Sequence, residues 1–260
     1  LMTAYLMSNY RTLNRYKVNL SENKSATIHG KIHYKNIPHQ FFAYLSGAVS
    51  RSWTAILYST TIDQNAHTLL QAEYAPNHSN NYSITISTRK EIAWHDTSIG
   101  ATAEYSTNTS KILRQSVITN YQFNSFFITA NLAFNLIKYI RLTDNYKWTI
   151  SQSKAGNYIN TIRNISNETS LDVTFLPNRL LLNTALQYTH NSGFTDRKDY
   201  TFMTLSITFK PSKKVQLVLN FDNILNTDTF VYRSNSNLTE GYTLYQLRPR
   251  CVMLTTHFAL

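Results

Sequence analysis

The chain has 260 residues, of which 15% are charged and 13% aromatic, a composition too aromatic for a disordered chain and less charged than that of most water-soluble domains. The formal net charge is +11, but Lys and Arg are scattered and form no basic run interleaved with aromatics, so we expect no nucleic-acid partner. The single cysteine, Cys251, excludes an internal disulfide framework and a multi-cysteine metal site.

No segment of the sequence has the roughly 20 consecutive apolar residues that a membrane-spanning helix needs. A strand of a transmembrane β-barrel needs only about 9 to 11 residues with every second one apolar, so a membrane barrel is not excluded. Residues 1–16 lack the basic segment, the apolar stretch and the cleavage site of a secretory signal. If the protein is exported, we expect its export signal to lie outside this sequence.

The first clear strand signal is ATIHGKIHYK, residues 26–35, which alternates with period two over its whole length. One phase is mostly apolar, and the other is the polar row His29, Lys31, His33 and Lys35. Two histidines on one strand face can approach a single metal ion. Polar side chains are also ordinary at the inward positions of a water-filled barrel, and we favour that interpretation over a metal or anion site.

Strand signals continue along the chain and become more regular in its second half. In the first half they cover residues 39–61, 95–105, 115–123 and 125–134. Residues 171–192 then predict two strands joined by a tight turn at 176–178. Two further strands are predicted from apolar residues in phase, namely Met203, Leu205, Ile207 and Phe209, and then Val215, Leu217, Leu219 and Phe221.

The connections between these later strands alternate in length. Those at 176–178 and 210–214 are short, whereas those at 191–199 and 223–241 are long. Short turns at one end and long loops at the other are typical of outer-membrane barrels, as are aromatic residues near strand ends. Such aromatic residues are Phe175, Tyr188, Phe209 and Phe221.

The sequence therefore predicts an all-β fold, an antiparallel transmembrane β-barrel with about 12 to 14 strands in this chain. A soluble β-sandwich also gives alternating strands and is the main alternative for the fold. A solenoid would require a fixed repeat period, which the sequence does not show.

The C-terminal segments carry a resemblance to a known family. An Asn-x-x-Asn stretch followed by an aromatic residue precedes a Tyr-x-Leu and Pro-Arg segment, and a final amphipathic strand is expected within residues 242–260. The matching residues are Asn223, Asn226, Phe230, Tyr245, Leu247, Pro249 and Arg250. Together these segments resemble the end of TonB-dependent outer-membrane receptors.

In that family the final strand is thought to be the signal read by the assembly machinery, with an outward aromatic residue near its end. The resemblance implies that signal at the alternating apolar residues Val252, Leu254, Phe258 and Leu260. Phe258 is then expected to face lipid. The family usually ends on the aromatic residue itself, whereas this sequence continues beyond it to Leu260.

The resemblance implies energy-coupled nutrient uptake across the outer membrane of a Gram-negative bacterium, with no enzymatic activity and no cofactor. Family members have about 22 strands around an N-terminal plug, which 260 residues cannot supply. Residues 1–260 are therefore expected to be the C-terminal part of the barrel domain, with the plug and the other strands absent. The expected partners are outer-membrane lipid, those missing parts, the TonB energy-coupling complex and a surface lipoprotein lid.

We expect the final strand to pair with residues 215–221 on one side, and on the other with a segment outside this chain. A ladder between it and the first 40 residues would instead indicate a complete small barrel.

A catalytic alternative rests on YTHNSG, residues 188–193, where His190 and Ser192 share a strand face. This pair resembles the His-x-Ser of the outer-membrane phospholipases, small barrels whose serine is activated by a histidine. The Arg-Ser-Trp-Asn segment that follows the serine in that family is missing here, so no third partner is evident. A phospholipase and a passive pore are the alternatives to the receptor.

Overall fold

The computed structural model describes residues 5–9, 12–16, 21–62, 68–114, 117–176, 179–193, 198–236 and 239–258. Within these ranges the chain is all-β apart from one short 3-10 turn, Trp94–Asp96. Thirteen of the described strands form one sheet, and two more form a separate hairpin. The strands are β1 (Tyr5–Asn9), β2 (Thr12–Tyr16), β3 (Lys24–Asn36), β4 (Phe41–Ile62), β5 (Thr68–Ile92), β6 (Thr97–Arg114), β7 (Val117–Ile137), β8 (Ile140–Ala155), β9 (Tyr158–Leu176), β10 (Leu180–Asn191), β11 (Asp199–Ser212), β12 (Val215–Asp222), β13 (Thr229–Ser236), β14 (Thr239–Gln246) and β15 (Cys251–Phe258).

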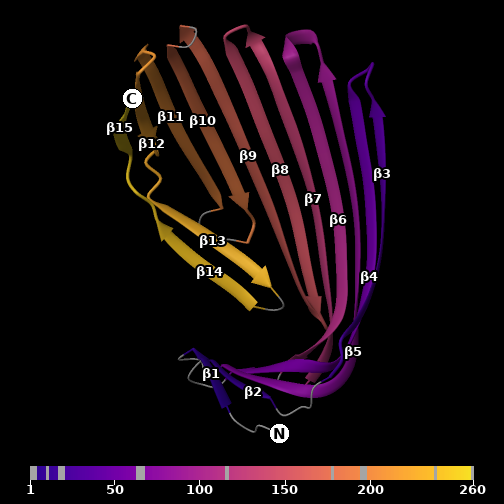
Figure 1. The fold of residues 1–260 in the computed structure, drawn as a ribbon. Helices are drawn as coiled ribbons and strands as arrows, with labels where there is room; N and C mark the ends of the chain where they lie inside the picture. The colour runs from indigo at the N-terminus through magenta and orange to yellow at the C-terminus, as the bar shows by residue number, and fades with distance from the viewer. Residues whose placement is uncertain are drawn as a thin grey trace.

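The large sheet is mostly antiparallel and follows the chain order from β6 to β12, after which comes β15. β3 pairs with β4, while β1 and β2 extend the sheet from the beginning of β5. Figure 1 shows a single curved wall of strands, with β3 at one border and β15 at the other. Among the described strands β15 pairs only with β12. The sheet is therefore not closed, and no ladder joins β15 to the described part of the first 40 residues.

Apart from the β13–β14 hairpin, which contacts β11, no second layer packs on this wall in the part of the chain that the structure describes. Among the residues whose burial the structure describes, the buried apolar side chains are seven: Leu57, Ala72, Leu113, Tyr121, Ala155, Ile162 and Tyr200. A soluble β-sandwich buries the inner face of each sheet against the other. The β-sandwich alternative is therefore not supported. No helix among the described residues is long and apolar enough to cross a membrane.

Two strands predicted in the first half are one strand in the structure. Residues 115–123 and 125–134 both contribute to β7, because Asn124 continues the ladder by pairing with Thr107 on β6 and Gln152 on β8. The sequence predicted no part of β5 or β8, and only residues 171–176 of β9. In β5 the residues around Pro76 lie where the register with β4 shifts, which is a usual place for a proline within a strand.

The predicted final strand, residues 242–260, begins too early. The structure divides this segment between β14 and β15, and Pro249 lies between them. Proline cannot donate to a ladder and restricts the residue before it, so it separates the two strands. The predicted long loop at 223–241 contains β13, which pairs with β14 in a hairpin.

The predicted long connections, 191–199 and 223–241, both belong to the second half of the chain. The first half has long strands instead, since β4, β5 and β7 have 22, 25 and 21 residues. A membrane crossing needs about 9 to 11 residues. These strands therefore continue well past the length of a crossing, and only two residues separate β6 from β7 and β8 from β9.

Candidate functional site

One face of the large sheet is apolar from β3 to β15. Directly paired residues of neighbouring strands share a face, so the register joins the apolar residues into rows. One row is Ile32, Leu45, Ile86, Ala103, Ile128, Trp148 and Ile165, and another is Ile140, Val173, Leu182, Ile207, Leu219 and Leu254. None of these side chains is buried, and Ile32 and Leu254 are 65% and 67% exposed. Nothing in the described protein covers this face, so it requires an apolar surrounding.

The opposite face of the sheet is polar and is held together by side-chain hydrogen bonds between strands. The Ser87 and Thr102 hydroxyls lie 2.9 Å apart, and Ser206 donates to Asn220 at 2.7 Å. These pairs join β5 to β6 and β11 to β12. A polar face opposite an apolar one is what the wall of a water-filled barrel requires.

The apolar face forms a band of limited height. In β4 its outward apolar residues run from Phe41 to Val49, and in β7 from Phe126 to Phe134, spans close to the roughly 9 to 11 residues of a membrane crossing. Beyond the band the same face carries a polar row. Its members are Thr107, Asn124, Gln152 and Thr161, where Thr107 donates to Asn124 at 2.7 Å and Gln152 to Thr161 at 3.3 Å.

The β13–β14 hairpin lies against the polar face of β11, within the curve of the wall (Figure 1). The Phe230 ring meets Tyr200 and Phe202 edge-on, at centroid distances of 5.1 and 6.0 Å. It also stacks on Tyr245 of β14 at 6.3 Å. Phe230 and Tyr245 are both named by the family resemblance: Phe230 joins the hairpin to the wall, and Tyr245 packs on Phe230 from the second strand of the hairpin.

Two asparagines fasten the base of this hairpin. Asn223 accepts from the Thr227 amide at 2.9 Å and donates to the carbonyls of Thr227 and Arg248, both at 2.8 Å. The Asn226 side chain accepts from the Arg250 amide at 3.1 Å. Both asparagines have positive φ, 51° and 55°, which Asn tolerates better than most residues. The side chains thereby join the segment that leaves β12 to the segment that enters β15.

The remaining residues of the resemblance lie along that same base and on β15. The Leu247 amide donates to the Asp228 carbonyl at 2.8 Å, two residues before Pro249. Val252, Leu254 and Phe258 pair with Phe221, Leu219 and Val215, all on the apolar face. Leu260 lies outside the described residues.

A small cavity of 250 Å³ lies between the hairpin and the polar face of β8 to β11. Its lining includes Lys147, Tyr200 and Phe230. It also includes Asn164 and Thr189, whose Oδ1 and Oγ1 are buried without a hydrogen-bond partner. A buried polar atom without a partner is costly, so the cavity suits water or a polar solute. Nothing in the sequence distinguishes these two residues from other polar residues of the same face.

The catalytic alternative finds little support in the geometry. Ser192 Oγ accepts from the Arg163 amide at 2.8 Å, and His190 Nδ1 lies 2.8 Å from Asp199 Oδ1. Hydrogen bonds from Tyr188 and His190 lower the pKa of the Asp199 carboxyl. No hydrogen bond joins His190 to Ser192 within residues 179–193, so the structure does not bring them together as base and nucleophile.

The row of His29, Lys31, His33 and Lys35 lies on the polar face of β3. The His33 ring contacts Tyr44 at 4.8 Å, and Lys35 Nζ lies 5.9 Å from the Phe42 ring centroid. Over the ranges that the structure describes, no three His, Cys, Asp or Glu side chains gather as a metal site.

Comparison with known proteins gives matches to solved structures. No family model and no curated protein matches the chain. A double mutant of the ferric enterobactin receptor PfeA from Pseudomonas aeruginosa matches with a TM-score of 0.55 at 12% identity, over 82% of this chain and 34% of that chain. The siderophore receptor PirA from Acinetobacter baumannii matches with a TM-score of 0.52 at 14% identity, over 92% of this chain and 41% of that chain.

These matches confirm the resemblance predicted from the sequence at the level of the fold. Both neighbours are receptors by their descriptions, and the match spans well under half the length of either. The described wall therefore has the fold of part of a TonB-dependent siderophore receptor.

Proposed function

We propose that residues 1–260 form the C-terminal part of the barrel domain of a TonB-dependent receptor in the outer membrane of a Gram-negative bacterium. The observation that carries this proposal is the uncovered apolar band, which has the height of a membrane crossing and is backed by a polar face. Outer-membrane lipid is then the partner of the apolar face. The fold of the siderophore receptors supports the same assignment.

In this proposal the open border at β15 pairs with strands outside this chain. They complete a barrel of about 22 strands around a plug, in keeping with matches that cover about a third of the PfeA receptor chain. The TonB complex supplies energy for uptake of a scarce nutrient, and a surface lipoprotein lid is a further partner. Val252, Leu254, Phe258 and Leu260 serve as the assembly signal.

The hairpin and its cavity give this wall a place to meet the transported solute. The unpartnered Asn164 Oδ1 and Thr189 Oγ1 offer hydrogen bonds inside the curve of the wall, and Lys147 lies beside them. A passive pore would require neither a fastened hairpin over its inner face nor such a cavity, so the receptor is preferred to the pore.

Spin labels on adjacent residues of β15 test the proposal in the full chain reconstituted in lipid vesicles. A label at Leu254 is expected to be relaxed by oxygen, which is concentrated in lipid, and little by a water-soluble nickel complex. A label at Thr255 serves as the matched control, since Thr255 pairs with Val218 on the opposite face. It is expected to show the reverse pattern. Nickel access at Leu254 as high as at Thr255 would overturn the membrane assignment.

A further inference from the structure

Cationic side chains gather at the short-turn end of β9 to β12. Arg179 follows β9, Lys210 lies near the end of β11, and Lys213 and Lys214 form the turn before β12. The two turns are joined by a hydrogen bond from the Lys210 amide to the Arg179 carbonyl, at 2.7 Å. Two connections that are distant in the sequence therefore present their cations at one place.

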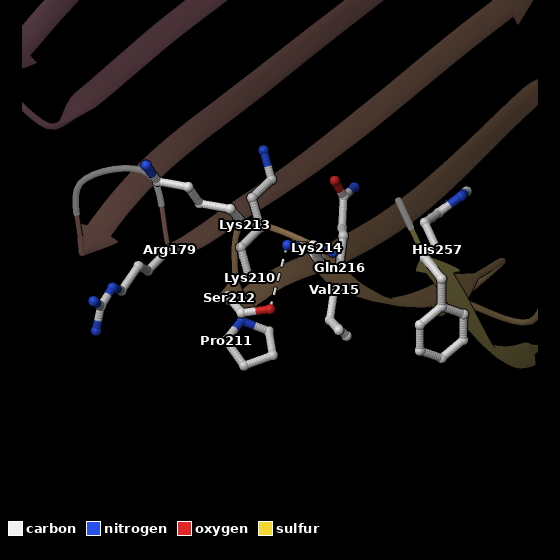
Figure 2. A pocket seen from close by; sticks show the side chains of 10 residues that line it. Arg179, Lys210, Pro211, Ser212, Lys213, Lys214, Val215, Gln216 and His257 are labelled. Carbon is white, nitrogen blue, oxygen red and sulfur yellow. Dashed lines mark hydrogen bonds between the residues drawn. The ribbon is translucent and has the colours of Figure 1, made fainter. Parts of the chain in front are cut away.

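These residues line a cavity of 560 Å³ whose other walls are partly apolar. Val215 and Phe258 are direct cross-strand partners on the apolar face, and Phe258 is 71% exposed. Figure 2 shows Gln216 and His257 on one side of the strands and Pro211 and Val215 on the other. Arg179 extends toward the side of Pro211 and Val215 (Figure 2). The cavity thus opens where the apolar band meets the cationic turns.

The positive charge of this place is not neutralised by the protein. The cavity lining contains no acidic residue. Within the residues that the structure describes, none of the four cations forms an ion pair. Arg179, Lys213 and Lys214 are exposed. Cations recur at this end of the sheet, since Lys138 lies over the Tyr139 ring at 5.5 Å in the turn between β7 and β8.

We propose that this cavity binds the phosphate of an anionic phospholipid, with Arg179, Lys213 and Lys214 around the phosphate and an acyl chain along Val215 and Phe258. Cationic side chains at a membrane surface attract anionic headgroups, and the adjoining apolar band gives the acyl chain a surface to follow. An acidic peptide would match the cations but would leave that apolar surface without a partner. The inference rests on the proposed membrane crossing of the wall.

Spin-labelled lipids test the site in the full chain reconstituted in vesicles. The measurement is the fraction of lipid that the protein immobilises, compared between labelled phosphatidylglycerol and labelled phosphatidylcholine. We expect about a fivefold preference for phosphatidylglycerol, on the order of one Lys or Arg contact with a headgroup. Replacing Arg179, Lys213 and Lys214 together by Gln is expected to bring the preference close to one.

The matched control replaces Lys31, Lys35 and Arg89 by Gln, because these cations lie on the polar face and their replacement removes the same charge. It is expected to keep the preference, as is the charge-conserving double variant Lys213→Arg with Lys214→Arg. If the test and control variants show an equal preference for phosphatidylglycerol, the proposed lipid site is wrong. The same result is expected if the cations bind an acidic peptide instead of a lipid. If the wild-type chain immobilises neither lipid, the membrane crossing itself is wrong, so the two failures are distinguishable.

Discussion

At the scale of single residues, Asn223 shows how a short motif acts through distant partners. Its side chain bonds Thr227 in the next turn and Arg248 beyond the hairpin. Its positive φ adds a second constraint. The asparagine therefore both shapes the end of β12 and fixes where the returning chain enters β15.

Asn223→Ala is expected to loosen the β13–β14 hairpin without unfolding the wall. The change leaves the Thr227 amide and the Thr227 and Arg248 carbonyls without these partners, at a cost of about 1 to 3 kcal/mol. Hydrogen–deuterium exchange should rise in residues 227–250 and stay unchanged in β6 to β9. Asn223→Gly is the control, because Gly adopts positive φ freely but makes no side-chain bond. Exchange in that variant as slow as in the wild type would assign the role to φ alone.

Ser192 gives the second prediction at this scale. Because its Oγ accepts from the Arg163 amide, Ser192→Ala should lower the free energy of unfolding by about 1 kcal/mol. We expect no phospholipase activity in the wild-type chain and none in the variant. The full chain with phospholipid and calcium is expected to release no fatty acid, measured before and after the substitution. Release that depends on Ser192 would favour the phospholipase over the receptor.

At the scale of the element, β12 separates two environments by alternating residues. Leu219 pairs with Ile207 and Leu254 on the apolar face, whereas Val218 pairs with Thr208 and Thr255 on the polar face. Leu219→Arg is expected to destabilise the folded state in lipid by about 2 to 4 kcal/mol if it lies near the midplane. Val218→Arg, one residue away, is the matched control and should cost much less, measured by urea unfolding in vesicles. Equal losses of stability in the two variants would show that both faces of β12 contact the same environment.

The same alternation explains which strands the sequence could predict. In β11 and β12 every second residue is apolar, because one phase faces the apolar surrounding along most of each strand, and both strands were predicted. No part of β5 was predicted, although Ile84 and Ile86 alternate on its apolar face. Its residues 77–81, Asn-His-Ser-Asn-Asn, lie beyond the apolar band, where neither face selects apolar side chains. In that segment the strand forms because β4 and β6 pair with it, and no local sequence pattern indicates that pairing.

The candidate site was predictable only where the family resemblance named its residues. Phe230 and Tyr245 were identified in this way, but their contact with Tyr200 depends on how the hairpin lies against the wall. Asn164 and Thr189 come from the ordinary polar phase of β9 and β10, and only the arrangement of strands under the hairpin leaves their oxygen atoms without partners.

At the scale of the whole molecule, the wall has an edge that must be covered. In a membrane every backbone group needs a partner within protein, because lipid offers none. Among described strands β15 has a ladder on one side only. Either a segment outside this chain covers the other side, or β3 does so by closing the sheet on itself.

Cysteine pairs distinguish these two arrangements in the full chain with Cys251→Ser. Val218→Cys with Thr255→Cys should form a disulfide readily under mild oxidation, because these residues are direct cross-strand partners and their Cα atoms lie within the reach of a disulfide bond. Thr27, His29 and Lys31 share the polar face of β3 and, each changed to Cys in turn, sample the registers that β3 would have against Thr255→Cys. We expect no disulfide within the chain for any of these three, read as unchanged mobility on a non-reducing gel. An efficient bond between β3 and β15 would instead mean a closed small barrel and would move the passive pore ahead of the receptor.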